Sequence, residues 1–238
     1  MSCAGPIEAS GPCPHDVIDD ICTRCTADNL WRIIVEASPS KHLQGELAET
    51  AFGCRRHLAE AAMRHMPLRY LEIGVRRGHS LALTTCCADV LDGHLEYAVG
   101  VDAWIPNYGD EPNEGKQVVY ELLEAVGAPW QNVSLMSGDS HEILPMLADI
   151  GEQRFNLILV DGDHTDSGAM QDLVDAFKLL EPGGELVFDD AVAGGENRLL
   201  HIWRQFVTLG PARPHLLAVG EELEDSPAFC WLQRSPDS

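Results

Sequence analysis

The sequence lacks any long hydrophobic run, although 45% of its 238 residues are hydrophobic. No uninterrupted apolar stretch approaches the roughly 20 residues that a membrane-spanning helix requires. The first 16 residues, MSCAGPIEASGPCPHD, contain neither the basic segment nor the apolar segment of a secretory signal. We therefore expect a cytoplasmic protein, and the chain length suits one α/β domain with a short helical extension.

Basic residues are scarce in this chain. It has 16 Lys and Arg against 38 Asp and Glu, which gives a net charge of −22. A negative field of this size repels polyphosphates, so we expect neither nucleic acid nor an anionic membrane as a partner. The simplest interpretation of the acidic surface is solubility, and attraction of a cationic substrate is the alternative.

A complete zinc motif is also missing. Cys22 and Cys25 form one CxxC pair and Cys13 precedes them, but no second CxxC or HxxxH pair follows at zinc spacing. Cytoplasmic cysteines are normally reduced, so we expect free thiols at these positions. A structural zinc ion on the three cysteines is the alternative.

The chain divides into three parts. Residues 1–15 are rich in loop-forming residues and are expected to be a mobile N-terminus. Residues 16–66 place apolar side chains at the three-and-four spacing of helices, which predicts a helical cap that ends before Pro67. In residues 67–238, apolar strand-like runs alternate with amphipathic helical stretches. This last part is expected to form an α/β domain.

Seven strands are predicted in the α/β domain. They are RYLEI (69–73), LEYAVGV (95–101), NVSLM (132–136), FNLILV (155–160), ELVF (185–188), HLLAVG (215–220) and AFCWLQR (228–234). Helical stretches separate the first five strands, which predicts right-handed βαβ units and a parallel sheet. No helix separates the last two strands, so they should form an antiparallel C-terminal hairpin. The expected fold is a Rossmann-like, mostly parallel sheet.

Ligands of such sheets bind at the carboxyl ends of the strands, where this sequence places glycines and short polar residues. After the first strand, Gly74 and Gly78 allow a tight turn and a close approach of backbone to ligand. After the second strand, Asp102 is placed to accept hydrogen bonds from ribose hydroxyls. After the third strand, Asp139 and Ser140 can bond the amine of adenine.

Four segments in order, RYLEIGVRRGHS, VGVDAW, SGDSHEILP and LILVDGDH…LLEPGGELVFDD, resemble the class I S-adenosylmethionine-dependent methyltransferases. Among these they are similar to the metal-dependent O-methyltransferases, both the catechol type and the macrolide and aminocoumarin sugar type. The resemblance spans about residues 69–192 and implies an S-adenosylmethionine-binding domain over residues 67–238. The cofactor residues that it implies are Glu72, Gly74, Gly78 and Ser80 on the methionine and ribose side, Asp102 at the ribose, Asp139, Ser140 and His141 around adenine, and Asp161 beside the methionine end.

Three carboxylates follow the fourth and fifth strands. Asp161 ends the fourth strand, and Asp189 and Asp190 follow the fifth, 28 and 29 residues later. These strands are neighbours in the expected sheet, so the carboxylates should converge, and a hard divalent cation such as Mg²⁺ would remove their repulsion. The resemblance implies the same three residues as metal ligands, with Asp as the last ligand, as in the sugar enzymes. The alternative is that the acidic pair caps the next helix.

A candidate general base lies three residues after Asp161. His164 occupies the position at which the catechol enzymes carry a Lys base, and histidine has an ordinary pKa near 6.5. Asp163 is the alternative base. Asp161 is also predicted to be a catalytic residue, because it would hold the metal ion. The structural alternative is that His164 caps the following helix.

The predicted function is methylation of a hydroxyl on a small molecule, such as a sugar, natural product or catechol-like compound, with S-adenosylmethionine and Mg²⁺. A metal-independent N- or C-methyltransferase is the first alternative, because it needs no acidic triad. A NAD-dependent oxidoreductase is the second, and Arg76 argues against it by standing where GxGxxG requires its middle glycine. The sequence does not identify the methyl acceptor, although Trp104 and Tyr108 are expected to face it. It also leaves open whether the protein forms a homo-oligomer.

Overall fold

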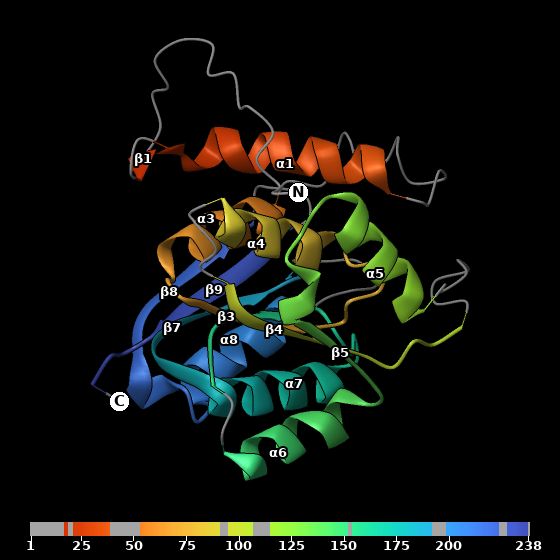
Figure 1. Ribbon diagram of the computed structural model, residues 1–238. Coiled ribbons are helices and arrows are strands. Elements are labelled where there is room, and N and C mark those ends of the chain that lie inside the picture. The colour runs from red at the N-terminus through yellow and green to blue at the C-terminus, as the bar shows by residue number, and fades with distance from the viewer. Residues whose placement is uncertain are drawn as a thin grey trace.

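The structure is a computed structural model (Figure 1). It describes residues 17–18, 21–38, 53–90, 95–106, 115–151, 154–191, 199–223 and 228–237, with side chains from residue 26 onward. The segment 1–15, including Cys13, lies outside the described residues, as does Tyr108. Only the backbone is described for Cys22 and Cys25. The mobile N-terminus and the state of these three thiols therefore stay predictions.

A seven-stranded sheet forms the centre of the fold, in the order β5-β4-β3-β6-β7-β9-β8. Five neighbouring strands are parallel, whereas β9 is antiparallel to both β7 and β8, which confirms the predicted sheet and its C-terminal hairpin. Every residue of β6 is buried, as expected for a central parallel strand. The strands are β3 (Leu68–Ile73), β4 (Leu95–Asp102), β5 (Val133–Ser137), β6 (Phe155–Val160), β7 (Leu180–Phe188), β8 (Leu216–Glu222) and β9 (Phe229–Arg234).

Helices cover both faces of the sheet (Figure 1). One face carries α1 (Thr23–Ala37), α3 (Gly53–Arg64), α4 (His79–Asp89) and α5 (Lys116–Ala125), and the other carries α6 (Ser140–Ile150), α7 (Asp166–Leu179) and α8 (Leu200–Leu209). Short 3-10 turns lie at Trp130–Asn132 and Arg213–His215. Fully buried side chains such as Leu58, Leu81 and Phe206 fill the two layers, each stabilising the fold by about 1.5–3 kcal/mol. Among the described helices, none has the length and apolar character needed to cross a bilayer.

Two local predictions were wrong. Residues 16–22 were expected to be helical, but β1 (Val17–Ile18) pairs antiparallel with β2 (Ile21–Cys22), in keeping with the preference of β-branched residues for extended backbone. The fifth strand begins at Leu180 rather than at residue 185. Leu180 pairs with Phe155, and residues 181–184 then leave the ladder as a bulge before pairing resumes.

The segment preceding the α/β domain packs directly onto that domain. Helix α3 lies between α1 and the sheet, and its His57 and Arg64 both contact the carboxylate of Glu185 in β7, the latter at 3.4 Å. Burial opposes ionisation of Glu185, but these partners outweigh it and hold its pKa well below the usual range. The contact fixes α3 so that its first turn reaches the carboxyl ends of the strands. The boundary at residue 66 stays a prediction.

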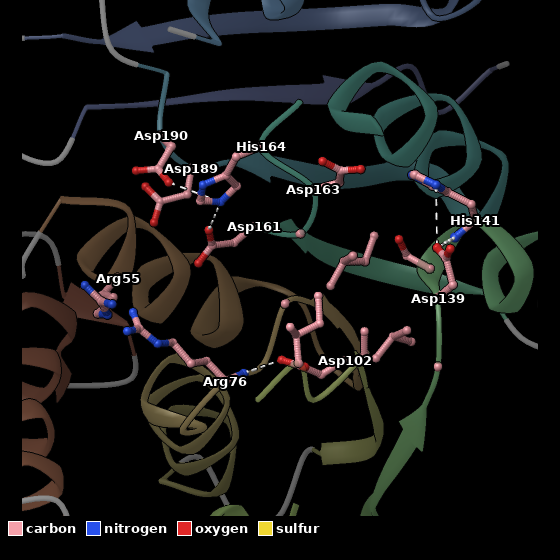
Figure 2. Close-up of a pocket in the computed structure, with 18 residues that line it drawn as sticks. Arg55, Arg76, Asp102, Asp139, His141, Asp161, Asp163, His164, Asp189 and Asp190 are labelled. Carbon is pink, nitrogen blue, oxygen red and sulfur yellow. Dashed lines mark hydrogen bonds and ion pairs between the residues drawn. The ribbon is translucent and has the colours of Figure 1, made fainter. Parts of the chain in front are cut away.

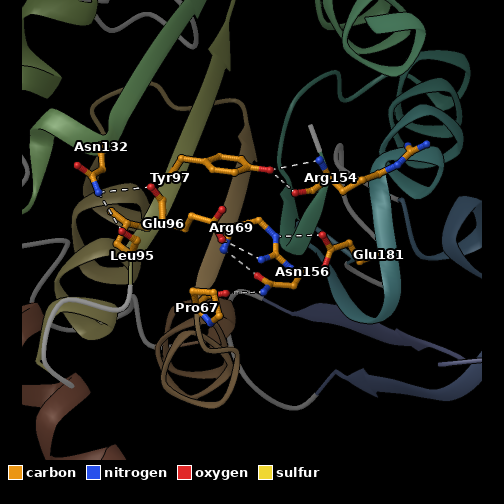
Figure 3. A network of polar contacts seen from close by, with 9 residues as sticks. All are labelled: Pro67, Arg69, Leu95, Glu96, Tyr97, Asn132, Arg154, Asn156 and Glu181. Carbon is orange, nitrogen blue, oxygen red and sulfur yellow. Dashed lines mark hydrogen bonds and ion pairs between the residues drawn. The ribbon is translucent and has the colours of Figure 1, made fainter. Parts of the chain in front are cut away.

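The amino ends of the central strands are joined by polar side chains (Figure 3). Arg69 of β3 forms ion pairs with Glu181 and, at 2.9 Å, with Glu96. The backbone N–H of Arg69 donates to Asn156 Oδ1 over 2.9 Å, and Asn156 Nδ2 donates to the carbonyl of Pro67 over 2.7 Å. These contacts lie at the edge of the sheet away from the candidate site, so their role is structural.

Candidate active site

A pocket of about 540 Å³ lies at the carboxyl ends of β3 to β7 (Figure 2). This is where parallel α/β sheets bind their ligands, and the volume suits a small molecule. Its lining includes most of the residues predicted from the sequence. These are Gly74, Asp102, Asp139, Ser140 and His141 among the cofactor residues, and Asp161, Asp163, His164, Asp189 and Asp190 among the metal and catalytic residues.

Gly74 allows the ends of β3 and β6 to close on each other. Its backbone has φ 86°, in the left-handed region, and its N–H donates to the carbonyl of Val101 over 2.9 Å. A Cβ at this position would lie 1.8 Å from the backbone oxygen of Asp161. The residue after β3 must therefore be glycine for Asp161 to take its place in the pocket wall.

Asp102 ties together the turns that follow β3 and β4. Its Oδ2 accepts a hydrogen bond from the backbone N–H of Arg76 over 2.6 Å, and its Oδ1 accepts one from Trp104 over 2.5 Å. Both donors have positive φ, 51° and 49°, which is uncommon outside glycine and concentrates at functional sites. Each carboxylate oxygen has a further lone pair, so Asp102 can still accept ribose hydroxyls.

The third strand end forms the opposite wall of the pocket. Asp139 caps α6, since its side chain accepts the backbone N–H of His141 over 2.9 Å. The His141 ring lies against the carbonyl of Gly168 in α7, 3.3 Å from Nε2. This wall therefore presents short polar groups and one imidazole from a fixed helix start.

Three titratable groups meet at the end of β6 and β7. Nε2 of His164 lies 3.5 Å from Oδ1 of Asp161 and 3.3 Å from Oδ2 of Asp190. One potential ligand atom from each residue lies within 4.8 Å of the others. Asp190 reaches this place through a left-handed backbone, with φ 56°. The predicted convergence of strand-end carboxylates holds for Asp161 and Asp190, and His164 joins them.

Burial, neighbouring carboxylates and hydrogen bonding shift the pKa values of these three side chains. Burial, with the charges of Asp189 and Asp190, raises the pKa of Asp161 to about 7, even though the hydrogen bond with His164 lowers it. Burial and the charge of Asp189 also raise the pKa of Asp190. The pKa of His164 is raised chiefly by its hydrogen bond with Asp161. The site thus favours positive charge among its carboxylates.

Asp189 lies in the same wall but faces α3. It is 7% exposed, and its Oδ2 accepts a hydrogen bond from the thiol of Cys54 over 3.3 Å. Within the described residues, its Oδ1 is buried without a hydrogen-bond partner. A buried carboxylate oxygen without a partner is costly, and a cation in the pocket would satisfy it.

The helix-capping alternatives do not describe this site. Helix α8 begins at Leu200, and its N-cap is Leu199 rather than either residue of the acidic pair. Helix α7 is capped by Thr165, whose hydroxyl accepts the N–H of Gly168 over 3.1 Å, and not by His164. The carboxylate of Asp163 accepts the N–H of Thr165 over 2.8 Å, so it is engaged in the loop.

Three of the implied cofactor residues lie behind the pocket surface. Glu72 is buried in β3 and accepts a hydrogen bond from Tyr70 over 2.7 Å. Gly78 precedes α4 with φ 76°, where a Cβ would lie 2.5 Å from Val119 Cγ1. Ser80 is buried in the first turn of α4. In this structure these three residues support the loop after β3 without lining the pocket.

Residues that were not predicted as site residues also take part in the site. Arg55 and Arg76 line the pocket, and the Arg55 guanidinium lies 5.0 Å from the ring centroid of Trp31, which joins α3 to α1. Cys54 supports Asp189. The helical periodicity of α3 predicted its secondary structure, but it carried no signal that the first turn reaches the site.

Comparisons with known proteins identify the family and the fold of the chain. A sequence model of a methyltransferase-domain family matches residues 71–191, just over half of the chain. A protein of Mycobacterium sp. (strain JLS), provisionally named an O-methyltransferase, is 34% identical over 85 residues, which are 36% of this chain and 36% of that protein. The match therefore spans about a third of the length of this relative.

Solved structures share the fold. The O-methyltransferase TomG of Streptomyces achromogenes, involved in tomaymycin synthesis and crystallised with S-adenosylmethionine, is 20% identical with a TM-score of 0.60, over 85% of this chain and 89% of TomG. MycE of the mycinamycin pathway, crystallised with Mg, S-adenosylhomocysteine and mycinamycin VI, is 15% identical with a TM-score of 0.50, over 74% of this chain and 47% of MycE.

Proposed function

Because this chain belongs to the methyltransferase-domain family matched over residues 71–191, we propose that it is an S-adenosylmethionine-dependent O-methyltransferase that works with a divalent metal ion on a small hydroxylated molecule. The observation that carries the proposal is the pocket wall in which Asp161 and Asp190 meet the Nε2 of His164, with Asp189 lining the same pocket. The wall combines oxygen ligands for a cation with a base for a hydroxyl proton.

The cofactor would occupy the pocket between the ends of β3, β4 and β5. Asp102 would accept the ribose hydroxyls, and Asp139, Ser140 and His141 would surround adenine. The methionine end would then point toward Asp161. The fold shared with TomG, which binds S-adenosylmethionine, supports this placement. A sulfonium cation would also be attracted by the acidic wall.

The metal would be held by Asp161, Asp189 and Asp190. The residues fit a hard cation, because all three offer carboxylate oxygens and the buried Oδ1 of Asp189 has no partner among the described residues. The Mg bound to MycE supports the same choice. When bound, the ion would lower the pKa of a neighbouring hydroxyl by Lewis-acid polarisation.

His164 would act as the general base. Its Nε2 would accept the hydroxyl proton, and Asp161 and Asp190, at 3.5 and 3.3 Å from that atom, would then stabilise the positive charge on the ring. The hydroxyl oxygen forms a bond to the methyl carbon, the carbon–sulfur bond breaks, and S-adenosylhomocysteine leaves. Most of the rate increase would come from positioning of the reactants, since the sulfonium is already activated.

Two alternatives fit the pocket less well. In a dinucleotide site, the second glycine lets the backbone approach the pyrophosphate. Here Arg76 keeps a left-handed φ of 51° at that position but adds a long side chain, which argues against NAD. A metal-independent N- or C-methyltransferase would have no use for three carboxylates in one wall.

The test is transfer of a labelled methyl group from S-adenosylmethionine to a panel of sugars, catechols and amines, with the linkage of each product determined. We expect an O-methylated product whose formation stops after chelation with EDTA and returns with Mg²⁺. His164→Ala should slow single-turnover transfer by about 10²–10⁴. Full activity after rigorous chelation, or methylation at nitrogen or carbon alone, would overturn the proposal in favour of the metal-independent alternative.

A further inference from the structure

We propose that Asp172 is a positioning residue that joins the adenine side of the pocket to the loop that carries His164. The inference rests on the proposed function, because it concerns the seating of the same cofactor. Asp172 lies in α7 and does not line the pocket. Its side chain is completely buried, with 0% exposure, yet its carboxylate contacts residues from two walls of the pocket.

One oxygen of Asp172 holds the loop after β6. Oδ2 accepts a hydrogen bond from the backbone N–H of Asp163 over 3.1 Å. Gly162 packs against the same oxygen, so that a Cβ on Gly162 would lie 2.5 Å from it. Asp163 directly precedes His164, and the carboxylate therefore fixes the backbone on which the proposed base is carried.

The same carboxylate holds the start of α6. Its Oδ1, which has no hydrogen-bond partner among the described residues, lies 3.5 Å from Nε2 of His141, and interaction with the Ser140 side chain lowers the pKa of the carboxyl group. Both partners line the pocket where adenine is proposed to bind. Asp172 is therefore one buried side chain that contacts both the start of α6, where adenine is proposed to bind, and the loop that carries His164.

Burying a carboxylate costs free energy unless hydrogen bonds or ion pairs satisfy its oxygens. Burial raises the pKa of Asp172, whereas the interaction with Ser140, the hydrogen bond from Asp163 and the charge of His141 oppose that rise. These opposing contacts all come from the two pocket segments. Loss of the charge should therefore loosen both segments together, and an amide cannot restore the ion pair with His141.

Asp175 provides a matched control on the same helix. It lies about one turn further along α7 and is also buried, at 2% exposure. Its oxygens accept hydrogen bonds from Gln171 Nε2 over 2.5 Å and from Lys178 Nζ over 2.6 Å. None of these residues lines the pocket. Asp175→Asn thus removes a buried carboxylate from α7 without touching either pocket segment.

The first measurement compares S-adenosylhomocysteine affinity by calorimetry for the 238-residue wild type, Asp172→Asn and Asp175→Asn. Both variants should lower the melting temperature. We expect Asp172→Asn to weaken binding at least about tenfold, as loss of an orienting residue behind a binding site does, and Asp175→Asn to leave it within about twofold. Equal affinities for the two variants would overturn the inference. If Asp172→Asn does not fold, Asp172→Glu and its matched control Asp175→Glu, which keep the charge but displace it by one methylene, should show the same contrast in affinity.

A second measurement does not depend on the cofactor. Amide hydrogen exchange should rise in Asp172→Asn at residues 138–142 and 161–166 together, and should rise at neither segment in Asp175→Asn. Unchanged exchange at both segments would contradict the positioning role. A wild type that binds no S-adenosylhomocysteine would count against the proposed function, and the exchange comparison would then decide the role of Asp172 by itself.

Discussion

The thiol of Cys54 donates a hydrogen bond to Oδ2 of Asp189 over 3.3 Å, which links the first turn of α3 to the end of β7. Burial and the charge of Asp189 raise the pKa of Cys54 well above its ordinary value, so the sulfur stays protonated and remains a donor. The contact engages one oxygen of Asp189 and leaves Oδ1 without a partner among the described residues. A helix outside the matched family region therefore sets the orientation of a proposed metal ligand.

Removal of this donor should weaken the metal site. We expect Cys54→Ala to lower the affinity for Mn²⁺, used as a spectroscopic substitute for Mg²⁺, by about tenfold or more, because groups that orient metal ligands typically contribute 10–100-fold. Cys54→Ser keeps a donor and should stay within about threefold of wild type. Electron paramagnetic resonance of a Mn²⁺ titration measures both. Cys230→Ala, at another buried cysteine, is the control, and equal affinity in the two alanine variants would refute the orienting role.

The turn after β3 should tolerate no side chain at Gly74. We expect Gly74→Ala to lower the free energy of unfolding by at least about 3 kcal/mol, because its Cβ would lie 1.8 Å from the backbone oxygen of Asp161. Gly183→Ala is the matched control, since Gly183 has a similar φ of 84° but no atom within 4 Å of the added carbon. It should lose only about 1–2 kcal/mol from backbone strain. Urea unfolding that gives the two variants equal losses would contradict the close approach.

Glu72 should make stability depend on pH. Burial, with the charges of Asp161 and Asp102, raises its pKa from 4.5 to about 8, against the hydrogen bond from Tyr70 that lowers it. The folded protein therefore keeps a proton that the unfolded chain has released, and stability from this group is complete below about pH 4.5 and is lost as the pH rises toward 8.

Glu72→Gln should remove this dependence. Between pH 5 and 8, the melting temperature of the cofactor-free wild type should fall relative to the variant by about 3–5 °C for each pH unit. Differential scanning calorimetry of both proteins in the same buffers gives the comparison. Parallel curves over this range would show that Glu72 is ionised in the folded state.

The sheet and most of the pocket could be predicted from the sequence because both depend on local patterns. Apolar runs such as FNLILV mark the strands, and parallel strands place the residues that follow them at one edge of the sheet. That rule alone places Gly74, Asp102 and Asp161 at one edge of the sheet. Glycine at position 74 also carries its own signal, since it is the residue that a left-handed turn favours.

Other features depend on contacts between distant segments, and nothing local marks them. Cys54 and Asp172 lie on helices with ordinary amphipathic spacing, and only the packing of those helices aims their side chains at the site. The left-handed backbone of Arg76, Trp104 and Asp190 was not predicted either. Positive φ is rare for Arg and Trp, and although Asp adopts it more often, a single aspartate does not mark such a turn. These positions shape the details of the site, whereas the strand ends determine its place.

Calorimetric titration of the 238-residue protein with S-adenosylmethionine, and separately with NAD, tests the central claim most directly. The account predicts saturable binding of S-adenosylmethionine and none of NAD. Asp102→Ala should weaken the binding by roughly 1.5–3 kcal/mol through loss of charge-assisted hydrogen bonds to the ribose. Absence of binding at millimolar S-adenosylmethionine, together with saturable binding of NAD, would contradict the account.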